Sequence, residues 1–234
     1  NKYPYSTYSS EANFMLGSLL LEKRKFKQAL KYLENAEYKE LSDRHQPSLL
    51  FNLGYCQMEL GDMKKAAVYF GKLKEQNSLY NLQAQYYYSF CQYATGNYGK
   101  ALPGFLAIEN SELYRGIVPY YIVQIYYQQK QYDEVYERAE QLLAIDNDSE
   151  NSGELHRMLG EIYFQQDKFL QAQQHLLAYH QWAVDQNKPL IREDLYLLGM
   201  SCYQTGDYEQ AVRWLGKVKK DNDAISQNSC LNMG

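Results

Sequence analysis

Large apolar and small residues recur in a fixed order along the chain, six times over. If each block is numbered so that its recurring alanine slot is position 20, positions 7, 17 and 24 carry mostly large apolar side chains. The slot itself falls at Ala29, Ala66, Ala101, Val135, Ala172 and Ala211, which stand 34 to 39 residues apart. A period near 34 is typical of stacked helix–turn–helix repeats. One block cannot bury its apolar face alone, so the pattern predicts an all-α solenoid.

Small residues at two positions of each block explain how its two helices can pack. Position 8 reads Gly17, Gly54, Ser89, Val123, Gly160 and Gly199. Small side chains at positions 8 and 20 let two antiparallel helices approach closely, and the large residues fill the space around them. We therefore expect these glycines and alanines to be buried at helix–helix contacts.

These positions resemble the tetratricopeptide repeat, which has small residues at 8 and 20 and large apolar ones at 7, 17 and 24. The resemblance implies a right-handed α-α superhelix of six helix pairs plus a partial seventh. The family's common Trp at position 4 and Pro at position 32 are missing here. The expected repeats span about residues 10–40, 47–78, 82–112, 116–146, 153–185 and 192–221, with a partial repeat at 223–234. This last segment reads as the start of another first helix, so we expect a single solenoid that is a fragment of a longer protein.

Charge and composition exclude several classes of protein. The net charge of −4 and the lack of a run dense in Lys and Arg argue against a nucleic-acid groove. No apolar stretch reaches the roughly 20 residues that span a bilayer. Tyrosine is the compositional outlier, with 25 copies among 234 residues.

Motifs of catalysis, cofactor binding and metal binding are missing. The sequence has no phosphate-binding Gly-rich loop, no G-x-S-x-G and no H-E-x-x-H. His175 and His180 are five residues apart and miss the spacing that places two ligands on one helix face. We expect no cofactor, no metal and no enzymatic activity.

The four cysteines do not suggest a disulfide framework. Cys56 and Cys91 occupy position 10 of adjacent repeats. Equivalent points on neighbouring helices lie roughly 8–10 Å apart, farther than the ~7 Å between Cα atoms that a disulfide allows. All four are expected to be small buried side chains.

Aromatic residues gather where the repeat family lines its concave surface. The resemblance implies that positions 5, 9 and 12 of each first helix point into that groove, and most of them are Phe or Tyr here. Solvated helix faces are not normally built this way. The predicted partner-binding residues are Phe51, Tyr55, Tyr86, Phe90, Tyr93, Tyr120, Tyr127, Arg157, Phe164, Tyr196 and Tyr203.

Two interpretations of these aromatic residues compete. In one, neighbouring rings pack on each other and serve only the superhelix. In the other, they form a binding surface for a protein or peptide, because Tyr offers a large contact area and a hydroxyl at low rotamer cost. We predict a non-enzymatic scaffold centred on Tyr86, Phe90, Tyr93, Tyr120 and Tyr127. A carbohydrate or small-ligand module and a purely structural spacer are the alternatives.

Two further resemblances bear on partner and location. Tetratricopeptide domains that hold a partner's C-terminal carboxylate carry Lys and Asn at positions 5 and 9 of one repeat, where this chain has Phe14 and Ser18. That clamp is therefore absent from this register, although Asn52 matches a further clamp position. The sequence segments from Asp194 to Leu215 and from Tyr87 to Phe105 resemble long repeat proteins of Bacteroidota. This resemblance implies a location in the cell envelope, in the periplasm.

Overall fold

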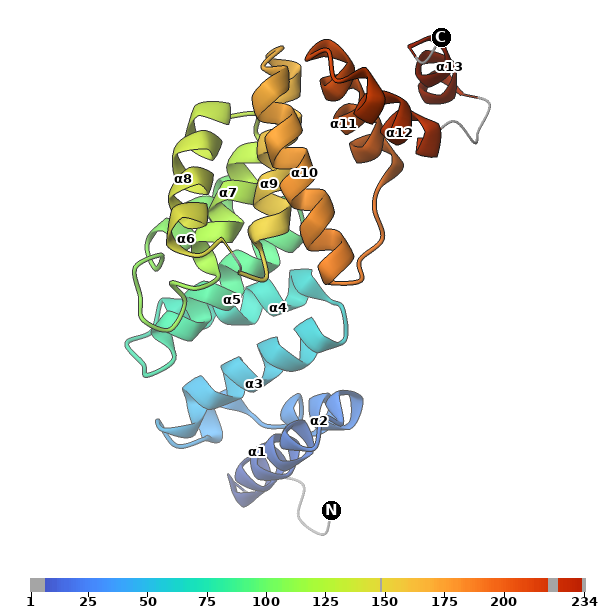
Figure 1. Ribbon diagram of the computed structural model, residues 1–234. Coiled ribbons are helices and arrows are strands. Elements are labelled where there is room, and N and C mark those ends of the chain that lie inside the picture. Colours follow the sequence, from blue (N-terminus) through green and yellow to red (C-terminus); the bar gives the residue numbers. More distant parts are fainter. Residues whose placement is uncertain (1–6, 148, 219–222, 233–234) are drawn as a thin grey trace. The chain divides into compact units, whose positions relative to one another are not determined.

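The computed structural model describes residues 7–147, 149–218 and 223–232. Every regular element in these ranges is a helix, so the all-α prediction is confirmed (Figure 1). The bounds are α1 Thr7–Glu22, α2 Phe26–Leu33, η1 (a 3-10 turn) Tyr38–Glu40, α3 His45–Glu59, α4 Met63–Lys74, α5 Asn81–Ala94, α6 Tyr98–Leu106, α7 Val118–Gln128, α8 Tyr132–Ile145, α9 Ser152–Gln165, α10 Phe169–Asp185, α11 Arg192–Gln204, α12 Tyr208–Val218 and α13 Ala224–Leu231. The partial repeat predicted at 223–234 is described as far as residue 232, and residues 219–221 of the sixth predicted repeat lie outside the described ranges.

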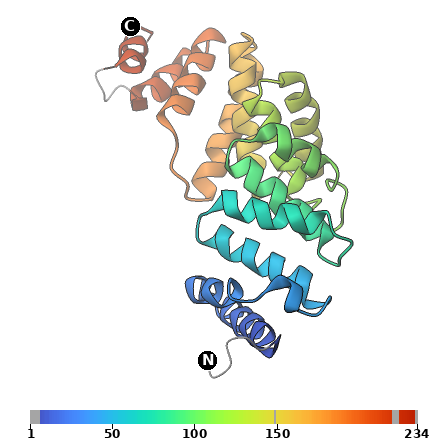
Figure 2. The ribbon, with the colours of Figure 1, turned by 180° about the vertical axis from the view of Figure 1, so that it is seen from behind.

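The helices fall into two compact units, the first ending at Ile125 and the second beginning at Tyr126. In the first unit each helix packs on the next one along the chain from α1 to α6 (Figure 1). In the second unit the same succession runs from α8 to α13 (Figure 2). Helix α11 also touches α9. Contacts between successive helices are the arrangement expected of repeats that bury their apolar faces against neighbours. One continuous solenoid through both units stays a prediction.

The turn inside each predicted repeat has the same backbone geometry six times. In each of the six turns, a residue that follows the first helix adopts a positive φ. These residues are Arg24, Gly61, Gly96, Lys130, Asp167 and Gly206. The following N–H donates to the carbonyl five residues earlier, as in Asp62 N to Gln57 O at 2.8 Å and Asp207 N to Cys202 O at 2.9 Å. This is the Schellman ending, which satisfies the last carbonyls of the first helix and favours glycine. The recurrence of the turn therefore follows the sequence period even where the residue is not glycine.

The small positions lie at helix contacts, as predicted. The five alanines of the slot are at most 1% exposed. A Cβ added at Gly54 would lie 2.9 Å from the ring of Phe70, and one added at Gly199 would lie 2.7 Å from the side chain of Leu215. Each of these glycines faces the large residue at position 24 of its own repeat. The position-8 residue is therefore small because the partner helix occupies the space of a side chain.

Some residues predicted to be buried are not. Leu16, at position 7 of the first repeat, is 40% exposed. Cys56, Cys91 and Cys202 are buried and free, but Cys230 on α13 is exposed. Helix α13 buries Ser226 and Ser229 and leaves Leu231 78% exposed. We would expect the apolar residues of such a terminal helix to pack on the sixth repeat, and this expectation is wrong for Leu231.

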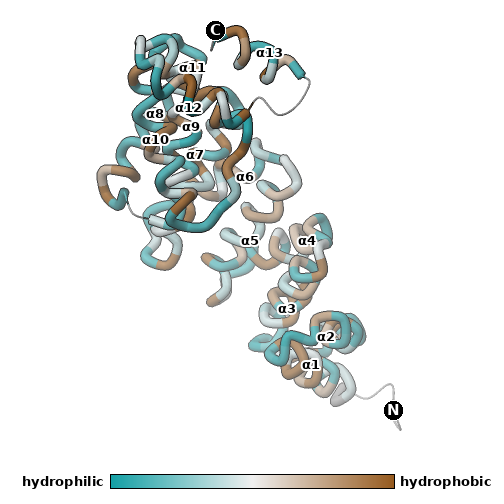
Figure 3. Tube along the Cα trace, turned by 45° about the vertical axis from the view of Figure 1, so that its right-hand side comes forward, coloured by the Kyte–Doolittle hydropathy of each residue, from teal (hydrophilic) through white to brown (hydrophobic). Residues whose placement is uncertain are grey.

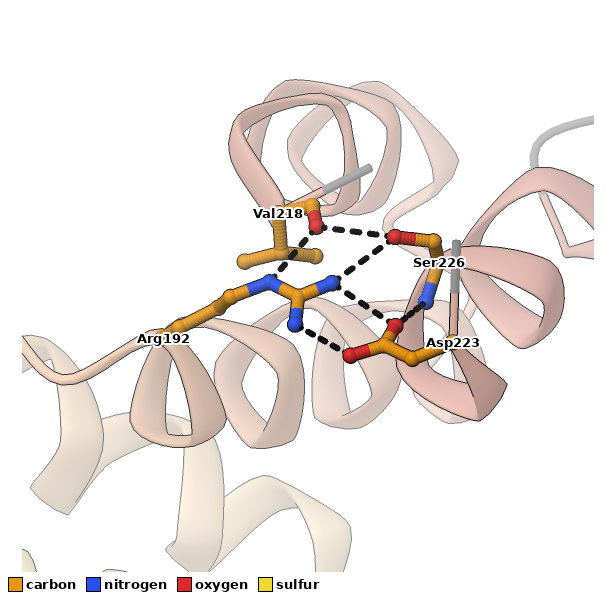
Figure 4. A network of polar contacts seen from close by, with 4 residues as sticks. All are labelled: Arg192, Val218, Asp223 and Ser226. Carbon is orange, nitrogen blue, oxygen red and sulfur yellow. Dashed lines mark hydrogen bonds and ion pairs between the residues drawn. The ribbon is translucent and has the colours of Figure 1, made fainter. Parts of the chain in front are cut away.

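A polar network, centred on Arg192, holds α13 instead (Figure 4). The guanidinium of Arg192 donates to the carbonyl of Val218 at 2.9 Å, to both oxygens of Asp223 at 2.5 and 2.9 Å, and to the hydroxyl of Ser226 at 2.7 Å. Asp223 also accepts from the backbone N–H of Ser226 and so caps α13. Arg192 and this N–H hold the pKa of Asp223 well below its usual range. The first residue of α11 thus fixes both the end of α12 and the start of α13.

None of the described helices is long and apolar enough to cross a membrane. Hydrophilic and hydrophobic stretches alternate along them in Figure 3. Such an alternation is expected of amphipathic helices, which bury one face and expose the other.

Candidate functional site

Six of the predicted binding residues lie in the first unit. Phe51 and Tyr55 come from α3, the next three from α5, and Tyr120 from α7. On α5, Tyr86, Phe90 and Tyr93 are spaced by four and three residues and so share one helix face. All six side chains are half-buried. They are therefore neither core residues nor freely solvated, and the two interpretations of the sequence are not mutually exclusive.

Ring contacts connect these six residues into one network, here called the first aromatic surface. Tyr87 links the rings of Phe51 and Tyr86, with centroid distances of 5.7 and 5.2 Å. Tyr121 links Phe90 at 5.8 Å with Tyr93 at 5.1 Å and Tyr120 at 6.1 Å. Sequence reasoning missed both linking residues. Both stand at position 6 of their repeats, next to groove position 5. The recurrence of tyrosine at this position is the sequence signal that could have identified them.

Tyr86 is the most tightly packed member of the first aromatic surface. Its ring stacks on that of Tyr114, with centroids 4.2 Å apart and planes 6° from parallel. Burial, and then the neighbouring Tyr121, raise the pKa of Tyr86 above its usual value, and burial raises the pKa of Tyr114 to about 12. Both hydroxyls stay protonated at neutral pH and can donate hydrogen bonds.

Tyr93, Gln124 and Tyr120 form a hydrogen-bonded chain. The hydroxyl of Tyr93 donates to Oε1 of Gln124 at 2.5 Å, and Nε2 of Gln124 donates to the hydroxyl of Tyr120 at 2.7 Å. Gln124 comes from position 9 of its repeat, a groove position that is not aromatic. The amide holds two tyrosines of the predicted centre in definite orientations, which lowers the side-chain entropy that these tyrosines would lose when a partner binds.

The other five predicted residues belong to the second unit. Phe164 contacts Phe169 at 5.5 Å, and Tyr203 contacts Tyr208 at 5.7 Å, each across the turn of its own repeat. Tyr93 makes the same kind of contact with Tyr98 at 5.9 Å in the first unit. Position 12 thus packs on position 17, which explains why the aromatic rings at position 12 are half-buried. Tyr196 is half-buried too. The place of Tyr127 beside the predicted centre in the first unit stays a prediction.

Arg157 gathers three carboxylates in the second unit. Its Nε lies 2.9 Å from Oε2 of Glu154, while its Nη1 lies 3.9 Å from Oε2 of Glu161 and 4.0 Å from Oδ1 of Asp194. The hydroxyl of Tyr127 donates to Glu161. We call Glu154, Arg157, Glu161 and Asp194 the Arg157 cluster. The sequence pointed to Arg157, but Glu154 and Asp194 stand outside the groove positions and were missed.

Asp194 is the unusual member of the Arg157 cluster. Its side chain is 6% exposed, and its Oδ2 has no hydrogen-bond partner. Burial raises the pKa of Asp194 to about 6; Glu161 and Glu154 add to the rise, while Arg157 and a side-chain hydrogen bond with Tyr179 oppose it. Buried polar atoms without partners are rare because each costs free energy.

The described residues do not assemble a metal centre, and two of the buried thiols are held protonated. No group of three His, Cys, Asp or Glu side chains among them could hold a metal ion. His156 and His175 contact each other through their Nδ1 atoms at 2.9 Å, and burial lowers the pKa of both. Burial likewise raises the pKa of Cys56 to about 11 and that of Cys91 to about 12, so both thiols stay protonated.

Asn52, the one match to the carboxylate clamp, is engaged within the first unit. Its Nδ2 donates to Oγ of Ser18 at 2.9 Å, and that hydroxyl donates to the carbonyl of Phe14 at 2.8 Å. The three positions that were compared with the clamp are thus joined to one another by hydrogen bonds.

Family comparisons agree with the repeat pattern. A tetratricopeptide-repeat model matches residues 14–78, and a second one matches residues 195–220. No curated protein sequence matches the chain.

Solved structures share the fold at low sequence identity. PilF of Pseudomonas aeruginosa is 17% identical, the match covers 96% of this chain and 97% of that one, and the TM-score is 0.67. A tetratricopeptide repeat protein from Parabacteroides merdae is 14% identical over 97% of this chain and 100% of that one, with a TM-score of 0.61. NprR, solved in complex with its cognate peptide NprX, is 16% identical. The match covers 96% of this chain and 71% of that one, with a TM-score of 0.53. Residues 14–78 and 195–220 thus match tetratricopeptide repeats, and the chain has the helical fold of tetratricopeptide-repeat proteins.

Proposed function

We propose that the chain is a non-enzymatic scaffold that binds a protein or a peptide through the aromatic faces of its first helices. In the first unit this face is the first aromatic surface. In the second unit it comprises Tyr127, Arg157, Phe164, Tyr196 and Tyr203. We place the protein in the cell envelope, in the periplasm, on its resemblance to Bacteroidota repeat proteins.

The observation that carries the proposal is the half-burial of all eleven predicted residues. Rings used only for packing would be covered, as Phe70 and Phe105 are at 0% exposure. The proposed residues instead keep part of each side chain open while their neighbours hold them rigid. Rigid, partly exposed tyrosines are what interfaces enrich, since few rotamers are lost on binding. NprR offers a precedent, because its solved complex shows that this fold can take a peptide.

The test begins with capped dodecapeptides, selected from a random displayed library on the whole chain. The affinity of one selected peptide is then measured by fluorescence anisotropy for the unchanged chain, Tyr93→Ala and Tyr127→Ala. Truncating a central aromatic anchor is expected to cost more than ~2 kcal/mol of binding. Tyr69→Ala is the matched control, since Tyr69 is half-buried on α4, a second helix. Circular dichroism shows whether each variant is folded.

Each other outcome counts against part of the proposal. Unchanged affinity in folded Tyr93→Ala and Tyr127→Ala would remove the aromatic faces from the interaction. A chain that selects no peptide, and binds oligosaccharides in an array, would be the carbohydrate module. A chain that binds neither would be the structural spacer.

A further inference from the structure

The Arg157 cluster holds more negative charge than its one guanidinium can pair. Only the contact with Glu154 is within hydrogen-bond distance at 2.9 Å, while those with Glu161 and Asp194 are 3.9 and 4.0 Å long. Three ionised carboxylates and one arginine leave a net charge of −2. The second unit therefore presents a negative site on the same helix, α9, that supplies Arg157 and Phe164 to the proposed face.

Asp194 shows that this charge is only partly compensated by the part of the chain that the structure describes. Its Oδ2 is buried and has no hydrogen-bond partner. Arg192, two residues earlier on α11, bonds to Val218, Asp223 and Ser226. The side chain of Tyr179, from α10, is 4% exposed and shares a side-chain hydrogen bond with the carboxyl of Asp194. Burial, and then the negative charge of Asp194, raise the pKa of Tyr179. A phenol of raised pKa adds no positive charge, so among the described residues Arg157 is the cation that opposes the charge of Asp194.

A cation fits this site and an anion does not. A carboxylate from a partner would have to approach Arg157 past three like charges, and like charges so placed cost several kcal/mol. A positive group would meet Glu154 and Glu161, whose side chains are 34% and 29% exposed and thus within reach of solvent. Guanidinium suits the site better than ammonium, because it can bond two carboxylate oxygens in parallel.

We propose that the Arg157 cluster binds a basic side chain of the partner, arginine in preference to lysine. This inference rests on the proposed function and specifies the chemistry of the partner. The partner's guanidinium lies between Glu154 and Glu161 and supplies the positive charge that Asp194 lacks. The aromatic rings of the face give contact area, and the cluster selects which peptides are held.

The peptides selected above test the inference. We expect an arginine at one position of the selected sequences. Replacing it by citrulline, which has the same shape without the charge, should weaken binding at least about tenfold, as for other desolvated charge pairs. Replacing it by lysine should weaken binding less. The affinity of the arginine peptide should also fall as the pH drops below 6, where Asp194 takes up a proton.

Variants of the chain assign the effect to the cluster. Glu161→Gln and Asp194→Asn should each bring the arginine and citrulline peptides to within about threefold of each other. Asp194→Asn should also remove the loss of affinity below pH 6. Glu209→Gln, an exposed acid on α12 in the same unit, is the matched control and should keep the full ratio.

The inference and the proposed function fail separately. Selected peptides without a basic residue, or equal binding of the arginine and citrulline peptides, overturn the inference. The proposed function then still stands if Tyr93→Ala or Tyr127→Ala weakens binding. A chain that selects no peptide overturns both.

Discussion

Asp194→Asn is expected to make the chain more stable at neutral pH. The folded chain keeps the pKa of this carboxyl at about 6, compared with 3.8 for an unperturbed aspartate. Because folding raises the pKa of this acid, Asp194 contributes stability below about pH 4, and this stability is lost as the pH rises through 6. The difference of roughly two pKa units corresponds to about 3 kcal/mol at pH 7. Asparagine carries no charge and avoids this cost.

The expected gain at pH 7 is roughly 1–3 kcal/mol, because the amide also loses its attraction to Arg157. Urea unfolding of the unchanged chain and of Asp194→Asn, measured from pH 4 to pH 8, gives the difference directly. The difference should be small at pH 4, grow between pH 4 and 6, and level off above pH 7. Asp43→Asn, an exposed loop aspartate, is the control and should show no such growth.

A difference that does not change with pH would refute the reasoning. So would a variant that is less stable than the unchanged chain at pH 7, since Asp194 would then be a paired, stabilising charge. Confirmation would mean that the chain gives up stability at a residue of the Arg157 cluster, as functional sites commonly do.

Four other substitutions test the packing, one of the turns and the Arg192 network. Gly199→Ala should lower the free energy of unfolding by roughly 1–3 kcal/mol, because the added Cβ meets both the side chain and the backbone N of the facing leucine. Gly216→Ala, in the same repeat with nothing within 4 Å, should raise it by up to about 1 kcal/mol; urea midpoints compare the two. Lys130→Gly should raise the free energy of unfolding by on the order of 0.5–1 kcal/mol, because Lys130 has a φ of 58°, a backbone conformation in which glycine is unstrained. An unchanged urea midpoint would contradict this. Arg192→Gln should speed amide hydrogen exchange of Ser229 on α13 and leave exchange in the first unit unchanged. Equal exchange rates of Ser229 would show that the Arg192 network does not hold α13.

The sequence period predicts most of the fold because the same physical constraint acts in every repeat. A small position 8 faces a large position 24, and the turn ends each first helix in the same way. Arg24, Lys130 and Asp167 have no turn-forming glycine, yet their place in the period assigns them the same conformation. Local propensity alone would have missed these three turns.

The candidate site was less predictable because it depends on which helices meet. Asp194 and Arg157 are 37 residues apart, and no pattern within one repeat pairs them. The Arg192 network was equally hidden, since α13 buries serines and offers no apolar stripe. Tyr87 and Tyr121 lie one place away from the groove positions, and only ring contacts between helices reveal them.

The division into two compact units has an optical consequence. Both tryptophans of the sequence, Trp182 and Trp214, belong to the second unit, each with a lysine Nζ over its ring, Lys188 at 4.2 Å and Lys217 at 3.9 Å. Tryptophan emission therefore reports on residues after Tyr126 alone, whereas far-ultraviolet dichroism reports on every helix. Melting curves recorded by the two signals will superimpose if the units unfold together and will separate if they do not. The unmodified chain thus carries a built-in probe of its own cooperativity.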